Sequence, residues 1–163
     1  MRLPSLLYRS ERIGKHGKVF SLYKLKTLKD GTDRLSNFAV GDQYLKYGKF
    51  LRKTKIDEAL QVINVIRGQM NLVGPRPELV EHSYLIPKDI RKILLSRKPG
   101  LTSLASIAFA DEEQLISRAE DYWLKVKPIK IALDVFYVEH RDVFLDVWIL
   151  WKTAVIVLRS FFK

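Results

Sequence analysis

The sequence LRKTKIDEALQVINVIRGQMNLVGPRP, residues 51–77, joins an acidic pair, a helical pattern of apolar residues and a stiff corner. Thr54 is the predicted N-cap of the helix, with Asp57 three residues further on, close to a capping box. The helix is expected to bury an apolar stripe and to place Asp57 on a more polar side with Gln61 and Asn64. The apolar stripe consists of Ile56, Leu60, Ile63, Val65 or Ile66, and Met70.

Asp57 and Glu58 lie at the predicted start of this helix, directly after the cations Arg52, Lys53 and Lys55. Backbone N–H groups at a helix start favour anions, so a carboxylate there stays ionised and Asp57 would be a ready nucleophile. It could approach a diphosphate only with help from arginine and a divalent cation, for which Glu58 offers oxygen ligands. The alternative interpretation is that both acids only complement the helix dipole.

The corner Gly74-Pro75-Arg76-Pro77 follows the helix. Each proline fixes its own φ and restrains the residue before it, so Arg76 stands between two stiff neighbours. Such an arginine loses little entropy when its guanidinium binds a phosphate. An ordinary loop with an exposed arginine is the alternative, but the corner and the acid pair together favour phosphate chemistry.

At this point the chain resembles a known family. The segments LYKLKTLKDG (22–31), LRKTKIDEALQVINVIRGQMNLVGPRPE (51–78) and KPGLTSLAS (98–106) are similar to the bacterial sugar transferases. These are the monotopic polyprenyl-phosphate phosphoglycosyl transferases. The resemblance runs from about Ser5 to about Leu158, with the motifs in the family's order, and it leaves the sugar unnamed.

The resemblance implies an enzyme that moves a phospho-sugar from a UDP-sugar onto a polyprenyl phosphate. This reaction is the first step in assembling an exopolysaccharide, an O-antigen or the glycan of a glycoprotein. The family works by a ping-pong route: Asp57 would attack the sugar-proximal phosphorus and UMP would leave. The lipid phosphate would then attack the aspartyl phosphosugar.

The resemblance also implies roles for individual residues. Glu58 would help to hold Mg²⁺, and Asp146 is a second candidate for that metal site. Motif position assigns the phosphate and nucleotide side to four residues, Arg52, Pro75, Arg76 and Pro77.

One departure from the family pattern follows Thr102. Many members continue there to an arginine that is thought to hold phosphate, whereas this chain runs from Ser103 into the acidic Asp111-Glu112-Glu113. The departure leaves recognition of the base and the sugar open. It also leaves open a degenerate relative that binds UDP-sugars without turnover.

Length and composition predict one domain, residues 1–163, of α+β class and dominated by helices. The sequence has no cysteine, no Walker loop and no GxGxxG, and its three histidines lack the spacing of metal ligands. Residues 6–13 and 17–27 predict a small N-terminal β-hairpin. Amphipathic helices are predicted in four further segments: 87–97, 111–125, 128–140 and 143–162.

The basic charge is concentrated in the first third of the chain. Residues 1–56 hold 14 Lys/Arg and 4 Asp/Glu, a balance of +10, whereas the remainder contributes +1 to the total of +11. Such a segment suits phosphate head groups or nucleic acid. A non-catalytic nucleic-acid or membrane-surface binding protein is therefore the alternative function, although no nucleic-acid motif is present and no nucleic acid is expected.

The last predicted helix, residues 143–162, is very apolar, but Asp146, Lys152 and Arg159 interrupt it. No stretch reaches the roughly 18 uncharged apolar residues of a spanning helix. Its tryptophans and phenylalanines favour a helix that lies on the membrane or packs on a partner, with an amphipathic core helix as the alternative.

The predicted location is the cytoplasmic face of the inner membrane, peripheral or monotopic. The chain begins where the family's N-terminal membrane-inserted segment would end, so the sequence predicts that this segment is missing. A homo-oligomer is left open.

Overall fold

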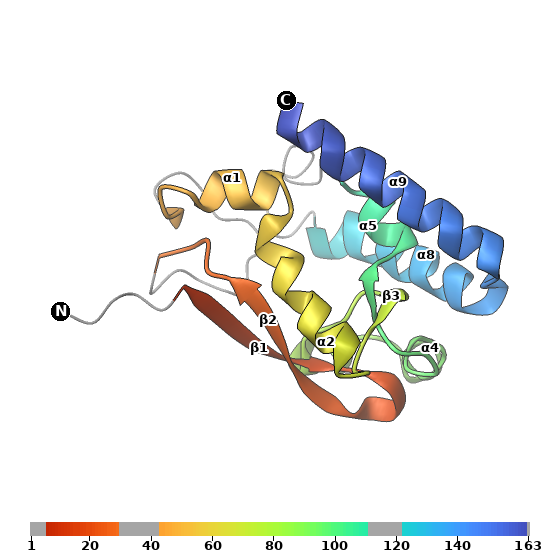
Figure 1. Ribbon diagram of the computed structural model, residues 1–163. Coiled ribbons are helices and arrows are strands. Elements are labelled where there is room, and N and C mark those ends of the chain that lie inside the picture. The colour runs from red at the N-terminus through yellow and green to blue at the C-terminus, as the bar shows by residue number, and fades with distance from the viewer. Residues whose placement is uncertain (1–5, 30–42, 111–121, 163) are drawn as a thin grey trace.

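The computed structural model describes residues 6–29, 43–110 and 122–162. It confirms a helix-dominated α+β domain, with a β-hairpin on one side and long helices on the other (Figure 1). The elements in chain order are β1 (Leu7–Ile13), η1 (Lys15–Gly17), β2 (Val19–Leu25), α1 (Gly48–Lys53), η3 (Ile56–Gln61), α2 (Val62–Ile66), β3 (Asn71–Val73), α3 (Val80–Ser83), α4 (Lys88–Leu94), β4 (Gly100–Thr102), α5 (Leu104–Ala108), η4 (Tyr122–Val126), α8 (Lys127–His140) and α9 (Val143–Phe162).

The predicted N-terminal hairpin is confirmed. Strands β1 and β2 are antiparallel, with Tyr8 opposite Lys24 and Arg12 opposite Phe20. Residues directly opposite one another in such a pair share a face of the sheet. Phe20 packs in a buried cluster with Met70, so Arg12 and Lys24 belong to the face that looks into the protein.

A second, two-stranded sheet joins two motifs that are far apart in the sequence. Strands β3 and β4 pair in parallel, which brings the Gly74-Pro75 corner against Pro99-Gly100. A Cβ on Gly74 would lie 2.6 Å from the Lys98 carbonyl oxygen, and one on Gly100 would lie 2.1 Å from the Gly74 nitrogen. Both positions therefore require glycine, because the two backbones touch.

The helix predicted from Thr54 is wrong in its start and its continuity. Thr54 ends α1, and its hydroxyl donates to the Phe50 carbonyl at 2.8 Å. Lys55 then adopts a left-handed conformation, with φ 60°, and turns the chain into the separate 3₁₀ helix η3. Asp57 thus lies in the first turn of a short helix after a sharp bend, because the Thr54 side chain binds the preceding helix instead of capping the next one.

The burial of this segment differs in part from the prediction: Met70 lies in the core as expected, but the polar residues are buried too. Asn64 is fully buried, whereas Ile66 is 81% exposed. The Asn64 amide donates to the Ser21 carbonyl of β2 and to the Gln69 side chain, both at 2.7 Å. The polar stripe is buried because it satisfies backbone and side-chain groups of the hairpin and its own loop, and the burial of Asp57 and Gln61 follows from the same packing.

The C-terminal helices have the predicted bounds. Helix α8 carries Pro128 in its first turn, where a missing N–H is tolerated. Helix α9 packs through the buried Ile149 and a 2.7 Å hydrogen bond between Thr153 and Thr102, while Phe144 is 87% exposed. No helix among the described residues is long and apolar enough to cross a membrane. The acidic run 111–113 and most of the predicted helix 111–125 lie outside the described residues.

Candidate active site

A cavity of about 580 Å³ lies between the hairpin, the η3 helix and the α8 and α9 helices. Four of the predicted site residues line it together: Arg52, Asp57, Glu58 and Arg76, with Pro77 beside them. Among the lining residues ten are basic and four are carboxylates, an excess that suits a ligand with several negative charges. The basic residues are Arg12, Lys24, Lys49, Arg52, Lys53, Lys55, Arg76, Lys127, Lys130 and Arg159.

Asp57 is a buried residue that nevertheless lines the cavity. The residue is 7% exposed, and the buried Oδ1 of its carboxylate has no hydrogen-bond partner in the described part of the chain. Burial and the neighbouring Glu58 raise the pKa of Asp57, against the lowering charges of Lys24 and Arg52. This pKa differs from the sequence expectation of a carboxylate stabilised in its ionised form, and it gives a more basic and hence stronger nucleophile once the proton has left.

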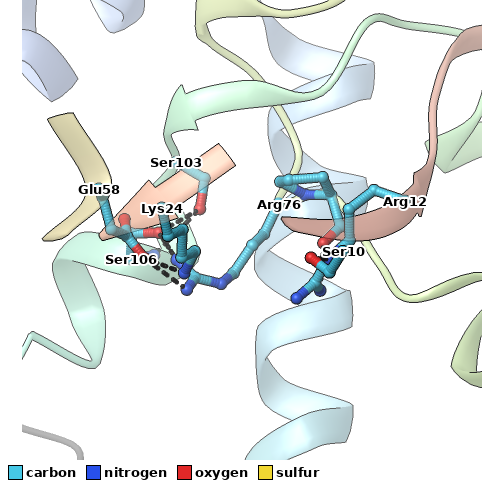
Figure 2. Close-up of polar contacts among 8 residues, drawn as sticks. Ser10, Arg12, Lys24, Glu58, Arg76, Ser103 and Ser106 are labelled. Atoms are coloured by element: carbon cyan, nitrogen blue, oxygen red, sulfur yellow. Dashed lines mark hydrogen bonds and ion pairs between the residues drawn. The ribbon is translucent and has the colours of Figure 1, made fainter. Parts of the chain in front are cut away.

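Glu58 is held by two cations at a single oxygen. Lys24 Nζ lies 2.6 Å and Arg76 Nη2 lies 3.2 Å from Glu58 Oε1, and Figure 2 draws the three side chains together. Burial alone would raise the pKa of Glu58, but the charges of Lys24 and Arg76 outweigh it and hold this pKa well below its usual range. The other oxygen, Oε2, accepts no hydrogen bond from the described residues. Glu58 therefore stays ionised with one oxygen available to a ligand.

The Pro-Arg-Pro corner holds the backbone of Arg76 rigidly while its side chain is exposed. Pro75 and Pro77 are buried and Arg76 is exposed, and the Pro75 carbonyl accepts from the Gly100 N–H at 3.0 Å. The Arg76 guanidinium reaches Glu58 and, at 3.3 Å, the Ser106 hydroxyl (Figure 2). Pro75 does not line the cavity, so its part in the site is to hold the corner.

Arg52 approaches the same cavity from the end of α1. Its guanidinium lies over the Tyr44 ring at 5.6 Å from the centroid, and its positive charge lowers the pKa of Asp57. Arg52 and Arg76 thus line the same cavity as the acid pair.

The structure does not bring Asp146 to the acid pair. Asp146 lies outside the residues that line the cavity, and its carboxylate accepts from the Tyr137 hydroxyl at 2.6 Å and from Arg141 Nη2 at 2.9 Å. Both oxygens are used in joining α8 to α9. The geometry gives Asp146 a structural role at that junction.

Asp134 is a cavity residue that sequence reasoning missed. It is 5% exposed, and its Oδ2 accepts the Arg76 backbone N–H at 3.0 Å. Burial raises the pKa of Asp134 to about 6, although the hydrogen bond from Arg76 opposes the rise. Asp134 therefore orients the corner from the side opposite Gly100 and is a second buried carboxylate that titrates near neutral pH.

The substitution Asp134→Asn should stabilise the fold at neutral and higher pH. The folded-state pKa lies above its ordinary 3.8, so stability falls as pH rises through about 6 and the buried charge is fully unfavourable above it. An amide keeps an acceptor for the Arg76 N–H without the charge. Urea unfolding at pH 8 should show a gain of up to about 3 kcal/mol, shrinking toward pH 4. A gain of the same size at both pH values would contradict this origin.

One sequence signal could have identified Asp134, whereas none pointed to Lys24. Asp134 is the only acid in the apolar run Ile131–Val138 of a predicted helix. An acid in such a run either is buried with a polar partner or lies on the solvent-facing side of the helix. Lys24 lies in the segment 22–31, whose resemblance to the family carried no role for this residue. Only the register of the hairpin shows that Lys24 faces Glu58.

The acid pair fits a magnesium ion whose coordination the substrate phosphates would complete. Mg²⁺ is commonly held by one or two carboxylates together with substrate phosphate oxygens. Glu58 Oε2 and the Asp57 carboxylate supply hard oxygen donors on one cavity wall. Across residues 6–29, 43–110 and 122–162 no group of three or more metal-binding side chains occurs, so these residues alone offer no complete set of metal ligands.

Comparison with known proteins adds independent evidence. The family model described as "Bacterial sugar transferase" matches residues 2–160. The sugar transferase EpsL of Bacillus subtilis (strain 168) is 38% identical over 157 residues, which cover 95% of this chain and 71% of EpsL. A UDP-glucose:undecaprenyl-phosphate glucose-1-phosphate transferase of Caulobacter vibrioides is 33% identical over 94% of this chain and 54% of that enzyme.

A more distant relative has the same chemistry in its name. The undecaprenyl-phosphate galactose phosphotransferase of Salmonella typhimurium (strain LT2) is 29% identical over 94% of this chain, which spans only 33% of that protein. The matches cover nearly all of this chain, and with it the acid pair and the Pro-Arg-Pro corner. The chain therefore belongs to the bacterial sugar transferase family.

Proposed function

We propose that this protein transfers a phospho-sugar from a UDP-sugar to a polyprenyl phosphate through a covalent intermediate on Asp57. The observation that carries the proposal is the buried Asp57 carboxylate, which makes no side-chain hydrogen bond to the described residues and lies in a strongly basic cavity. A purely structural acid at 7% exposure would be expected to have a partner. The named activities of the Salmonella and Caulobacter relatives support the same reaction class.

In the first step a carboxylate oxygen of Asp57 attacks the phosphorus next to the sugar. A bond forms between that oxygen and phosphorus, and the bond from phosphorus to the bridging oxygen of the diphosphate breaks. UMP leaves with the electron pair, and the phosphosugar remains on Asp57. Arg76, supported by Asp134 and Ser106, and Arg52 balance the phosphate charge that would otherwise repel the nucleophile.

Glu58 and Asp57 would hold Mg²⁺, which when bound neutralises the diphosphate and its developing negative charge. The protein's own contribution is to keep Glu58 ionised and oriented, through Lys24 and Arg76 on Oε1. These two contacts set the position of Oε2 before any ligand binds. This is preorganisation of an anionic ligand group in a buried site.

In the second step an oxygen of the lipid phosphate attacks the phosphorus of the aspartyl phosphosugar. The acyl phosphate bond breaks, Asp57 is regenerated and the lipid carries the sugar diphosphate. A membrane-surface location at the cytoplasmic face of the inner membrane fits this acceptor. The exposed aromatic side chains of α9 support it, since Trp148 and Trp151 are 42% and 58% exposed and Lys152 lies over both rings. The end of the same helix reaches the cavity through Ile156 and Arg159.

The decisive experiment is intact-protein mass spectrometry after incubation with Mg²⁺ and a panel of UDP-sugars, without lipid. One UDP-sugar should add the mass of its phosphosugar to the protein and release one equivalent of UMP. Polyprenyl phosphate in detergent micelles should then remove the adduct. The half-reaction needs no lipid, so the result does not depend on membrane access.

The alternatives give different outcomes. A degenerate relative would bind UDP-sugars without adduct or UMP. A non-catalytic surface or nucleic-acid binding protein would show neither adduct nor UDP-sugar binding. Either result in folded protein would refute the proposed reaction.

A further inference from the structure

Arg12 is a cavity residue for which the proposed reaction has no role yet. It comes from the hairpin, on the same inward face as Lys24, and lines the cavity beyond Arg76. Its Nε donates to the Ser10 hydroxyl and its Nη1 to the Pro77 carbonyl, both at 3.2 Å. The second bond ties the Arg12 guanidinium to the backbone of the corner that carries Arg76.

Both acceptors of Arg12 are neutral. Nη2 forms no hydrogen bond or ion pair in the described part of the chain, and no carboxylate within that part forms a salt bridge with this side chain. The nearest acid in sequence to its Pro77 contact, Glu78, is bound by Lys127 instead. Arg12 thus holds a partly buried positive charge with one unused donor group.

That charge is electrostatically unfavourable in the free protein. Burial lowers the pKa of Arg12, and the positive charge of Arg76 lowers it further. At the other end of the same hairpin face, burial also lowers the pKa of Lys24, but the negative charge of Glu58 partly offsets this lowering. Arg12 has no such offset from a directly bound acid. An anion in the cavity would supply it.

Figure 2 shows where the two arginine side chains end. The Arg76 side chain extends away from its backbone toward Glu58 and Ser106, while the Arg12 guanidinium ends on the other side, beside Ser10. Two cationic groups that end at separate points beside one backbone corner match two phosphate groups better than one. A diphosphate would meet Arg76 near the acid pair and Arg12 farther along.

We propose that Arg12 binds a phosphate group of the substrate, through Nη2, next to the phosphate held at the acid pair. The inference rests on the proposed function, in which two substrates bring phosphate: the nucleotide diphosphate sugar and the lipid phosphate. The donor's second phosphate fits best, since it is covalently joined to the phosphorus that Asp57 attacks. Arg12 would then also stabilise the departing UMP.

The first test uses inorganic pyrophosphate and so does not depend on turnover. Isothermal titration of the parent, Arg12→Gln and Arg9→Gln compares a cavity arginine with an exposed one on the same strand, which donates to Ser21. Loss of one charge-assisted contact should weaken pyrophosphate binding about tenfold to a hundredfold in Arg12→Gln, and not in Arg9→Gln. Equal affinities for parent and Arg12→Gln, or no pyrophosphate binding by the parent, would overturn the assignment.

Arg12 also supports the Pro77 carbonyl, so folding needs its own control. Arg12→Lys keeps the charge but not the planar group, and should fall between the parent and Arg12→Gln. Should Arg12→Gln fail to fold, a severalfold loss of pyrophosphate affinity in folded Arg12→Lys still supports the site, and parent-like affinity there rejects it.

The ping-pong kinetics identify which phosphate is bound. A raised KM for the UDP-sugar, with an unchanged KM for the polyprenyl phosphate, assigns Arg12 to the donor. The reverse pattern assigns it to the lipid phosphate. Unchanged KM values for both, with an unchanged rate of adduct formation, would rule out a contact with either substrate. A parent that binds pyrophosphate through Arg12 but forms no adduct would reject the proposed function and keep this site.

Discussion

Replacing Asp57 with asparagine should abolish formation of the phosphosugar adduct and of UMP while leaving the protein folded. The amide keeps the shape of the side chain but removes the nucleophilic oxygen, and loss of a nucleophile typically lowers turnover by about a thousandfold or more. Because burial and Glu58 both disfavour the ionised Asp57, the variant should unfold at a higher temperature than the parent at neutral pH.

Mass spectrometry and thermal unfolding together check this expectation. The matched control is Asp89→Asn, an exposed acid in the first turn of α4 that does not line the cavity, and it should change neither quantity. Adduct formation by Asp57→Asn at the parent's rate would exclude Asp57 as the nucleophile. A fall in unfolding temperature would show that its carboxylate is stabilised by contacts other than those described.

The pH dependence of the half-reaction follows from the same residue. Only ionised Asp57 can attack, and its pKa is raised, so the rate of adduct formation should increase with pH through a range above that of an ordinary aspartate.

Glu58→Gln should lower both stability and the response to Mg²⁺. The substitution removes the charge that Lys24 and Arg76 share, and leaves two partly buried cations without their acid. Such a loss is expected to destabilise the fold by about 2–4 kcal/mol at neutral pH. It also removes the oxygen proposed for the metal, so the half-reaction should lose most of its rate and its dependence on Mg²⁺ concentration.

The pH dependence of stability and a second substitution separate the loss of stability from the loss of activity. The pKa of Glu58 is depressed, so its contribution is present above about 4.3, the usual glutamate value, and is lost as pH falls. The stability gap between parent and variant, measured by urea unfolding, should therefore narrow under acidic conditions. Adding Lys24→Met to Glu58→Gln removes one uncompensated cation and should recover part of the stability, with no recovery of activity. A double variant no more stable than Glu58→Gln would exclude this ion pair as the cause.

The sequence alone predicted the fold class, the hairpin, and both C-terminal helices at their observed bounds. These features follow from local patterns: strand alternation around a glycine turn, Pro128 at a helix start, and the long apolar segment after residue 142. It also predicted that Arg52, Asp57, Glu58 and Arg76 form one site. That conclusion came from motif spacing and from resemblance to a family. Both indicate that these residues act together, but neither gives their distances or orientations.

Tertiary structure decided which face of the central segment is buried. Periodicity treats apolar residues as the core, but here Asn64 satisfies the Ser21 carbonyl and Gln69, so the polar stripe faces inward and Ile66 faces outward. The register of β1 with β2 turned Lys24 and Arg12 toward the cavity. The crossing of α8 behind the corner brought Asp134 to the Arg76 backbone, 58 residues away in the sequence. These partners are distant in the chain, and a buried polar group is stable only where the fold supplies its partner, so no local pattern could predict them.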